Sequence, residues 1–251
     1  MPVHNWKGIE DGIFHDLHGA WIQQIRKALN SGLLPRGFEA KSEQRSAQII
    51  PDVLTLEMNP LKGRKAIDEL SGGTAVLAPP KAVLKTSLDM LSYANRQNRI
   101  VIQHASGKKV VGVFEIVSRG NKSGRGNLNE FIAKAWSCLQ QGIHFSYVDV
   151  HPPGLLDPCG IHGEICFESG HEPPKLPRTK KLCAAGYEAT ETITAFVNPF
   201  GVGDLIPETP LFLRRGFHVM LPLEQTYNEA FTYFGEESKE IVEHNTHASS
   251  R

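Results

Sequence analysis

The stretch VVGVFEIVSRGNK (residues 110–122) combines the pattern of a buried strand with a basic, glycine-containing loop. Side chains of a strand alternate between two faces, so we expect Val111, Val113, Glu115 and Val117 to share one face. Glu115 is then a carboxylate within an apolar strand, where burial is costly unless a cation, a hydrogen-bonding network or a metal receives it. The fold and the chemistry of the chain both depend on how this glutamate is accommodated.

A second apolar run, IIPDVLTLEM (residues 49–58), carries Asp52 directly after a proline. If the two strands are neighbours, Asp52 and Glu115 can project to one point and bind a hard cation such as Mg²⁺ or Mn²⁺, which prefers oxygen ligands. On this hypothesis Lys122 stabilises charge on a bound phosphate and Asn121 positions it. The pattern therefore predicts a divalent-metal site that handles phosphates.

A purely structural interpretation of the two carboxylates is equally compatible with their spacing. Asp52 follows Pro51, which lacks an N–H group and belongs at a strand start or edge, so the carboxylate can be solvated there. Glu115 can form an ion pair with Arg99 or Arg119. The sequence leaves both interpretations open.

The residues after Glu115 predict a crossover between two parallel strands. A helix is expected over residues 127–141, since its apolar positions recur at helical spacing, and HFSYVDV (residues 144–150) is the next strand. Strand, loop, helix and strand form a βαβ unit with Glu115 near the end of its first strand. Ligands of such sheets gather outside those strand ends.

The other segments complete a single α/β domain spanning residues 1–251, in which helices flank a mixed central sheet. We interpret residues 59–98 as an insertion and residues 240–251 as a flexible tail. Further helices are expected over residues 11–30, 160–168 and 224–234, and further strands over 38–45, 99–105, 191–197 and 217–221.

Composition excludes several classes of protein. The chain has 251 residues, a formal net charge of +0 and 4 cysteines, so neither a disulfide framework nor a strongly electrostatic nucleic-acid binder is expected. No apolar run reaches the roughly 20 residues of a membrane span. The start, MPVHNWKGIEDG, lacks the features of a secretory signal, and we expect a cytoplasmic protein.

Two local clusters suggest further binding chemistry. Zinc is conceivable at Cys159, His162, Cys166 and His171, although HGEIC is typical of a short helix in which Cys166 is a small buried apolar residue. A basic region can meet a nucleic-acid backbone, or it can be the solvated ends of loops. Its members are Lys108, Lys109, Arg119, Lys122 and Arg125.

Several motifs resemble the family known as domain of unknown function 4058. They are MPVHNW at the start, GIFHDLHGAWI, PDVLTL, FEIVSRGNKSGRG with the following helix and YVDV strand, and LPLEQTY. The core is also similar to the PD-(D/E)xK nuclease superfamily, particularly its small Uma-type members. The resemblance implies a restriction-endonuclease-like fold and a metal held by Asp52, Glu115 and the backbone carbonyl of Ile116. An upstream acidic residue of that pattern would correspond to Glu43.

One departure from the superfamily pattern concerns the catalytic lysine. It belongs two residues after the glutamate, where this chain has Val117. Lys122, or Lys134 on the following helix, is the expected replacement. We therefore expect a Mg²⁺-dependent nuclease hydrolysing phosphodiester bonds, or else a non-catalytic binding or interaction protein that retains the fold.

Overall fold

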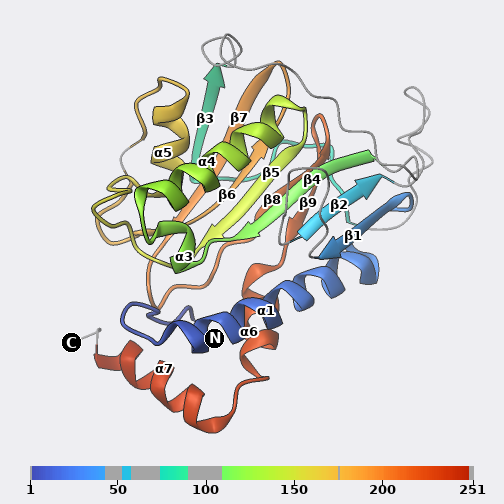
Figure 1. Ribbon diagram of the computed structural model, residues 1–251. Coiled ribbons are helices and arrows are strands. Elements are labelled where there is room, and N and C mark those ends of the chain that lie inside the picture. Colours follow the sequence, from blue (N-terminus) through green and yellow to red (C-terminus); the bar gives the residue numbers. More distant parts are fainter. Residues whose placement is uncertain (1, 43–52, 58–73, 90–108, 175, 249–251) are drawn as a thin grey trace.

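The computed structural model describes residues 2–42, 53–57, 74–89, 109–174 and 176–248 (Figure 1). Seven strands within these residues form one mixed sheet in the order β1-β2-β4-β5-β6-β7-β3, and β8 and β9 form a separate antiparallel pair. Their bounds are β1 Phe38–Ser42, β2 Val53–Glu57, β3 Leu84–Asp89, β4 Lys109–Ile116, β5 His144–Asp149, β6 Leu182–Glu188, β7 Thr192–Phe200, β8 Thr209–Arg214 and β9 Phe217–Leu221.

The predicted α/β class and the βαβ crossover are confirmed. Strands β4 and β5 are parallel and are joined through α4 (Arg125–Gln140), whereas the other described pairings in this sheet are antiparallel. The other helical elements are α1 Asp11–Ala28, the π-helical turn η1 Leu29–Leu33, α3 Arg119–Lys122, α5 Gly160–Glu168, α6 Leu223–Phe231 and α7 Glu236–Ala248.

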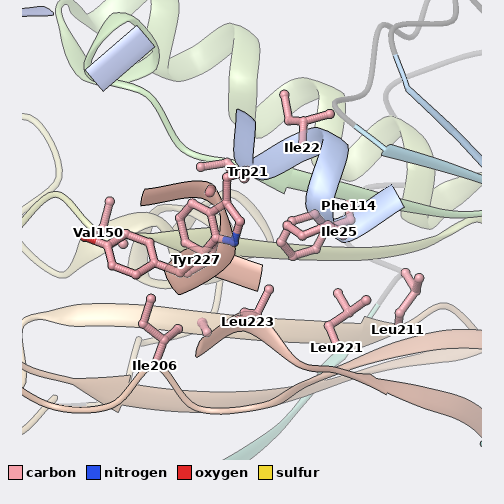
Figure 2. Packing of buried hydrophobic residues seen from close by; sticks show 14 of the residues in the cluster. Trp21, Ile22, Ile25, Phe114, Val150, Ile206, Leu211, Leu221, Leu223 and Tyr227 are labelled. Atoms are coloured by element: carbon pink, nitrogen blue, oxygen red, sulfur yellow. The ribbon is translucent and has the colours of Figure 1, made fainter. Parts of the chain in front are cut away.

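Helices and the β8–β9 pair cover the two faces of the sheet, and a hydrophobic cluster fills each side. Residues of α4 and α5 share one cluster, while residues of α1, α6, β8 and β9 share the other. In the second cluster the rings of Trp21 and Tyr227 meet edge to face at 5.1 Å, and Phe114 of β4 belongs to the same cluster (Figure 2). Since Trp21 belongs to α1 and Tyr227 to α6, burying these large rings holds the two helices together.

Strand β4 departs from strict alternation at one residue. In the β2–β4 ladder Thr55 pairs with Gly112, but Leu56 pairs with Val110, so Val111 is the extra residue of a β-bulge. Val111 therefore packs with the α1 cluster rather than with Val113, and its predicted face is wrong. Beyond the bulge the predicted alternation holds: Val113 packs on the α4 side of the sheet.

The last described helix, α7, overlaps the segment that was expected to be a tail (residues 240–251). Residues up to Ala248 form α7, whose Val242 is fully buried. The amide of Asn245 donates to the carbonyl of Asn5 at 2.7 Å, which ties α7 to the start of the chain. The helix α7 therefore includes residues up to Ala248 of the segment that was interpreted from the sequence as a tail.

Some predictions fall partly or wholly outside the described residues. Glu43, Asp52, Arg99 and Lys108 lie there, as does the strand expected over residues 99–105. Within the expected insertion the structure describes residues 74–89, which include β3 at the sheet edge beside β7. Strands β6 and β8 were not predicted from the sequence.

Candidate functional site

The structure brings Glu115 of β4 together with Lys134 of α4. Glu115 is 3% exposed, and its Oε2 lies 2.9 Å from Lys134 Nζ. Helix α4 packs on the face of the sheet to which Glu115 points, so a long side chain of the helix can reach the carboxylate. Burial, with the Glu115 charge nearby, raises the pKa of the Cys138 thiol on the same helix to about 12. Glu115 is thus enclosed between strand and helix.

The backbone carbonyl of Ile116, the neighbouring predicted metal ligand, points away from β5. The next amide, that of Val117, donates to the Val148 carbonyl at 2.9 Å, and a planar trans peptide places the Ile116 carbonyl on the opposite side. There it lies 3.1 Å from His18 Nε2 of α1. A carbonyl can only accept, so the Nε2 atom of His18 carries the hydrogen in this contact.

Val117 stands two residues after Glu115, at the place where the superfamily pattern has its lysine. Val117 is fully buried in the α4 cluster. Lys134, by contrast, approaches the same carboxylate from the helix and keeps 22% of its side chain exposed. Of the two candidate lysines, Lys134 is the one whose ammonium contacts Glu115.

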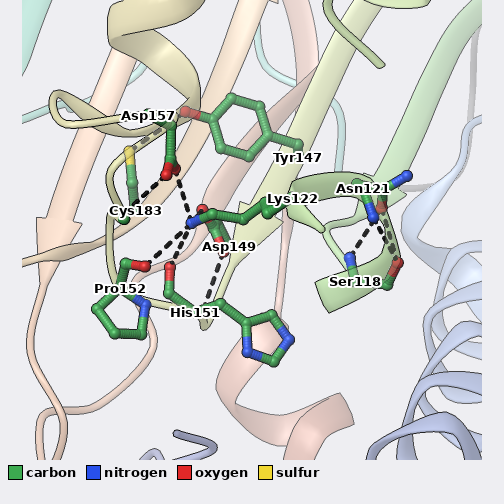
Figure 3. A network of polar contacts seen from close by, with 10 residues as sticks. Ser118, Asn121, Lys122, Tyr147, Asp149, His151, Pro152, Asp157 and Cys183 are labelled. Carbon is green, nitrogen blue, oxygen red and sulfur yellow. Dashed lines mark hydrogen bonds and ion pairs between the residues drawn. The ribbon is translucent and has the colours of Figure 1, made fainter. Parts of the chain in front are cut away.

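The other candidate, Lys122, points into a separate cage at the ends of β4 and β5 (Figure 3). Its ammonium lies 2.9 Å from Asp149 Oδ2 and 2.8 Å from Asp157 Oδ2. It also donates to the carbonyls of His151 and Pro152 at 2.8 and 3.2 Å. These four oxygens satisfy the ammonium, so the structure assigns Lys122 to an internal ionic cluster rather than to Glu115.

Charge in this cage is unbalanced, since one ammonium meets two carboxylates. Burial opposes the charged form of Lys122, but the attraction of Asp149 and Asp157 outweighs it and raises the lysine pKa. Burial also raises the pKa of Asp149, against the opposing effect of Lys122. Burial lowers the pKa of the adjacent His151 to about 3, so its imidazole is neutral at pH 7.

Asn121 has a capping role at the start of α3. Its Oδ1 accepts from the Ser118 amide at 2.9 Å, and the Ser118 hydroxyl accepts from the Asn121 amide at 3.3 Å. This reciprocal pair is a capping box, which fixes the chain where it leaves β4. The predicted phosphate-positioning role of Asn121 has no contact in the described residues that tests it.

Three cations of the basic region, Arg119, Lys122 and Arg125, contact groups within the protein. Arg119 lies 3.0 Å from Asp11 and also donates to the carbonyls of Ile9 and Trp6. Arg125 pairs with Glu164 at 3.1 Å. Together with the caged Lys122, these side chains form internal contacts at the positions where the sequence predicted a rim for nucleic acid.

The four residues considered as a zinc cluster lie in the described part of the chain, and His162, Cys166 and His171 contact protein groups. His162 Nδ1 lies 2.7 Å from the Tyr187 hydroxyl, and its Nε2 lies 3.5 Å from the buried Cys166 thiol. Burial lowers the pKa of His162 to about 4 and raises that of Cys166 to about 12. Among the described residues, no group of three or more His, Cys, Asp and Glu side chains could hold a metal ion.

The Glu115 region nevertheless has donors suited to a divalent cation. A buried carboxylate and a carbonyl outside the β4–β5 ladder belong to consecutive residues, and both are oxygen ligands. A complete site needs at least one further ligand, and the predicted one, Asp52, lies outside the described residues. Asp149 and Asp157 were missed as site candidates. The available signal was that Asp149 is the residue before the last in the strand predicted over residues 144–150.

No family model, curated protein or solved structure matches this chain. In the part of the chain that the structure describes, no helix combines the length and apolar character needed to span a membrane.

Proposed function

We propose that this protein is a metal-dependent hydrolase that cleaves phosphodiester bonds in nucleic acid, using Mg²⁺ or Mn²⁺. Glu115, the Ile116 carbonyl and Asp52 would hold the metal, and Lys134 would stabilise charge on the phosphate. The observation that carries the proposal is the 2.9 Å contact between Lys134 Nζ and Glu115 Oε2. It supplies, from α4, the amine that the sequence lacks at Val117.

The location of the pair supports this assignment. Glu115 is the residue before the last in β4, next to the parallel strand β5, and ligands of α/β sheets gather at such strand ends. When bound, a divalent cation supplies an activated water and stabilises negative charge on phosphate oxygens. A lysine ammonium beside it adds positive charge where the pentavalent phosphate would develop negative charge.

The proposal includes Asp52 because of the register between β2 and β4. Val53, the first residue of β2, pairs with Phe114 in an antiparallel ladder. Asp52 directly precedes Val53 in the sequence, and the proposal takes it as the second carboxylate. Two carboxylates at such a position suit a cation with ligand distances of about 2.1 Å.

Hydrolysis of plasmid DNA and of single-stranded RNA, with Mn²⁺ or Mg²⁺, tests the proposal. We expect wild-type cleavage to be abolished by EDTA and to fall by at least about 100-fold in Lys134→Met, since the lost charge acts in a buried site. Lys181→Met, which removes an exposed lysine, is the matched control and should retain activity. Cleavage that survives in Lys134→Met would contradict the assignment of the lysine.

A second candidate is a non-catalytic binding or interaction protein with the same fold. The internal pairing of Arg119, Lys122 and Arg125 favours it, because cations engaged within the protein are poorly available to a phosphate backbone. This candidate predicts no cleavage with either metal and no loss of nucleic-acid binding in Arg125→Met. Metal-dependent cleavage lost in Lys134→Met would exclude it.

A further inference from the structure

We infer that Phe131 of α4 is a positioning residue for the proposed reaction, because the face of its ring holds the Lys134 ammonium beside the Glu115 carboxylate. This inference rests on the proposed function, since it concerns the lysine of the same site. It starts from a second contact of that ammonium. Lys134 Nζ lies over the Phe131 ring, 5.3 Å from the ring centroid, as well as 2.9 Å from Glu115 Oε2.

The geometry of α4 directs the lysine over this ring. Phe131 lies three residues before Lys134, so the two side chains are neighbours on one face of the helix. Long side chains on a helix also lean toward its N-terminus, over the preceding turn. A cation within about 6 Å of a ring centroid is attracted by the negative face of the ring. The observed contact at 5.3 Å meets this criterion.

The Phe131 ring is itself fixed by the hydrophobic cluster on the α4 side of the sheet. Phe131 is only 2% exposed. Its ring meets that of the buried Phe145 of β5 at a centroid distance of 6.1 Å and an interplanar angle of 72°. Such edge-to-face pairs are favoured by the charge distribution of the two rings. Phe131 is therefore a rigid support for the lysine rather than a mobile surface ring.

Lys134 needs such a support because a different conformation is available to it. Its side chain is 22% exposed, so the ammonium has access to water. Glu130, an exposed carboxylate four residues earlier on α4, has the spacing of a helical ion pair with Lys134. Attraction to the Phe131 ring favours the inward conformation, in which the ammonium contacts Glu115, over an outward one.

The ring face matters most when a divalent cation is held at Glu115. The carboxylate then shares its negative charge with that cation, and the Lys134 ammonium is repelled by a like charge nearby. The Phe131 ring attracts the ammonium without carrying a net charge, so it neither competes for the cation nor repels a phosphate. It would thus keep the ammonium where negative charge develops on the phosphate.

NMR spectroscopy of the full chain without metal tests the placement of the ammonium. Protons above the face of an aromatic ring resonate upfield, so we expect the Lys134 Cε protons to lie upfield of those of exposed lysines. Their signal is identified by its loss in Lys134→Met, and Phe131→Leu should return it to the ordinary lysine position. Phe196→Leu is the matched control, since Lys85 Nζ lies 5.4 Å from the centroid of that ring, and it should shift only the Lys85 signal. A Lys134 signal unchanged in Phe131→Leu would contradict the inference.

Graded fluorination of Phe131 separates attraction by the ring face from packing. Replacement by mono-, di- and trifluorophenylalanine weakens the negative face of the ring and nearly preserves its shape. We expect kcat for Mn²⁺-dependent cleavage to fall stepwise with fluorination, by between about twofold and 30-fold in total. KM and the Mn²⁺ affinity should stay unchanged, because the ammonium acts on charge that develops in the transition state. The same series at Phe196 should leave kcat unchanged.

The results distinguish failure of this inference from failure of the proposed function. If wild type cleaves and Lys134→Met does not, but kcat is independent of fluorination at Phe131, the inference fails alone. In that case any loss of kcat in Phe131→Leu reflects packing, and it should follow the loss of unfolding free energy. If wild type neither binds Mn²⁺ nor cleaves nucleic acid, the proposed function fails and the inference fails with it.

Discussion

Replacing Lys122 with methionine removes the cation from a buried cluster and leaves two carboxylates facing each other. The side chains of Lys122, Asp149 and Asp157 are only 9%, 4% and 2% exposed, so solvent cannot screen the remaining charges. Removing one partner of a buried ion pair typically costs about 3–5 kcal/mol. For a chain of this size that corresponds to a fall in Tm of roughly 6–20 °C.

Urea denaturation at pH 7, followed by circular dichroism, measures this loss. Arg125→Met is the matched control, since it also removes the cation of an ion pair, here between α4 and Glu164 of α5. Its side chain is 52% exposed, so we expect a loss of no more than about 1 kcal/mol. Equal losses in the two variants would refute the claim that the Lys122 cage is a buried ionic cluster.

The difference in unfolding free energy between Lys122→Met and wild type should depend on pH, which provides a second test. Burial already raises the pKa of Asp149, and loss of the ammonium raises it further. The folded variant then binds more protons than its unfolded chain at pH values between about 3.9 and the raised pKa, so acid stabilises it relative to wild type. The difference in unfolding free energy should become smaller from pH 7 to pH 5, and a constant difference would contradict this account.

Two further predictions concern packing and acid stability. In Gly186→Ala the new Cβ would lie 2.3 Å from the Pro210 carbonyl oxygen, so we expect a loss of about 2–3 kcal/mol in urea denaturation, and a neutral effect would contradict the close contact between β6 and β8. Burial lowers the pKa of His4 and His162 to about 4 and that of His151 to about 3, against 6.5 when unfolded. Each should therefore lower the unfolding free energy by up to about 1.4 kcal/mol per pH unit as the pH falls from 6.5 toward its folded value; NMR titration should find these rings neutral at pH 5.

Local patterns predicted the elements that carry the strongest periodicity. The apolar stripe of α4 and the alternation after Gly112 placed Glu115 and its helix correctly, because burial on one face imposes a period on the sequence. The bulge at Val111 was invisible, since it depends on how β2 pairs with β4. Strand β6 (LCAAGYE) was missed because its alanines and glycine have little strand preference, although it is almost wholly buried.

The contacts of the candidate site also divide into those that the sequence could predict and those that it could not. Lys134 could be proposed from sequence, because a side chain on the inner face of a crossover helix lies near the strand that precedes it. The caging of Lys122 by Asp149 and Asp157 could not, since these residues meet only when β5 and the following loop are in place. The His18 contact with Ile116 likewise exists only once α1 packs on the sheet.

A crystal structure of the protein soaked in MnCl₂, with anomalous data collected near the manganese edge, tests the central claim most directly. The account predicts one anomalous peak about 2.1–2.2 Å from the Glu115 carboxylate and the Ile116 carbonyl, with Asp52 as a further protein ligand and Lys134 Nζ beside the ion. Saturating Mn²⁺ with no peak at Glu115, or with a peak only elsewhere on the molecule, would contradict it.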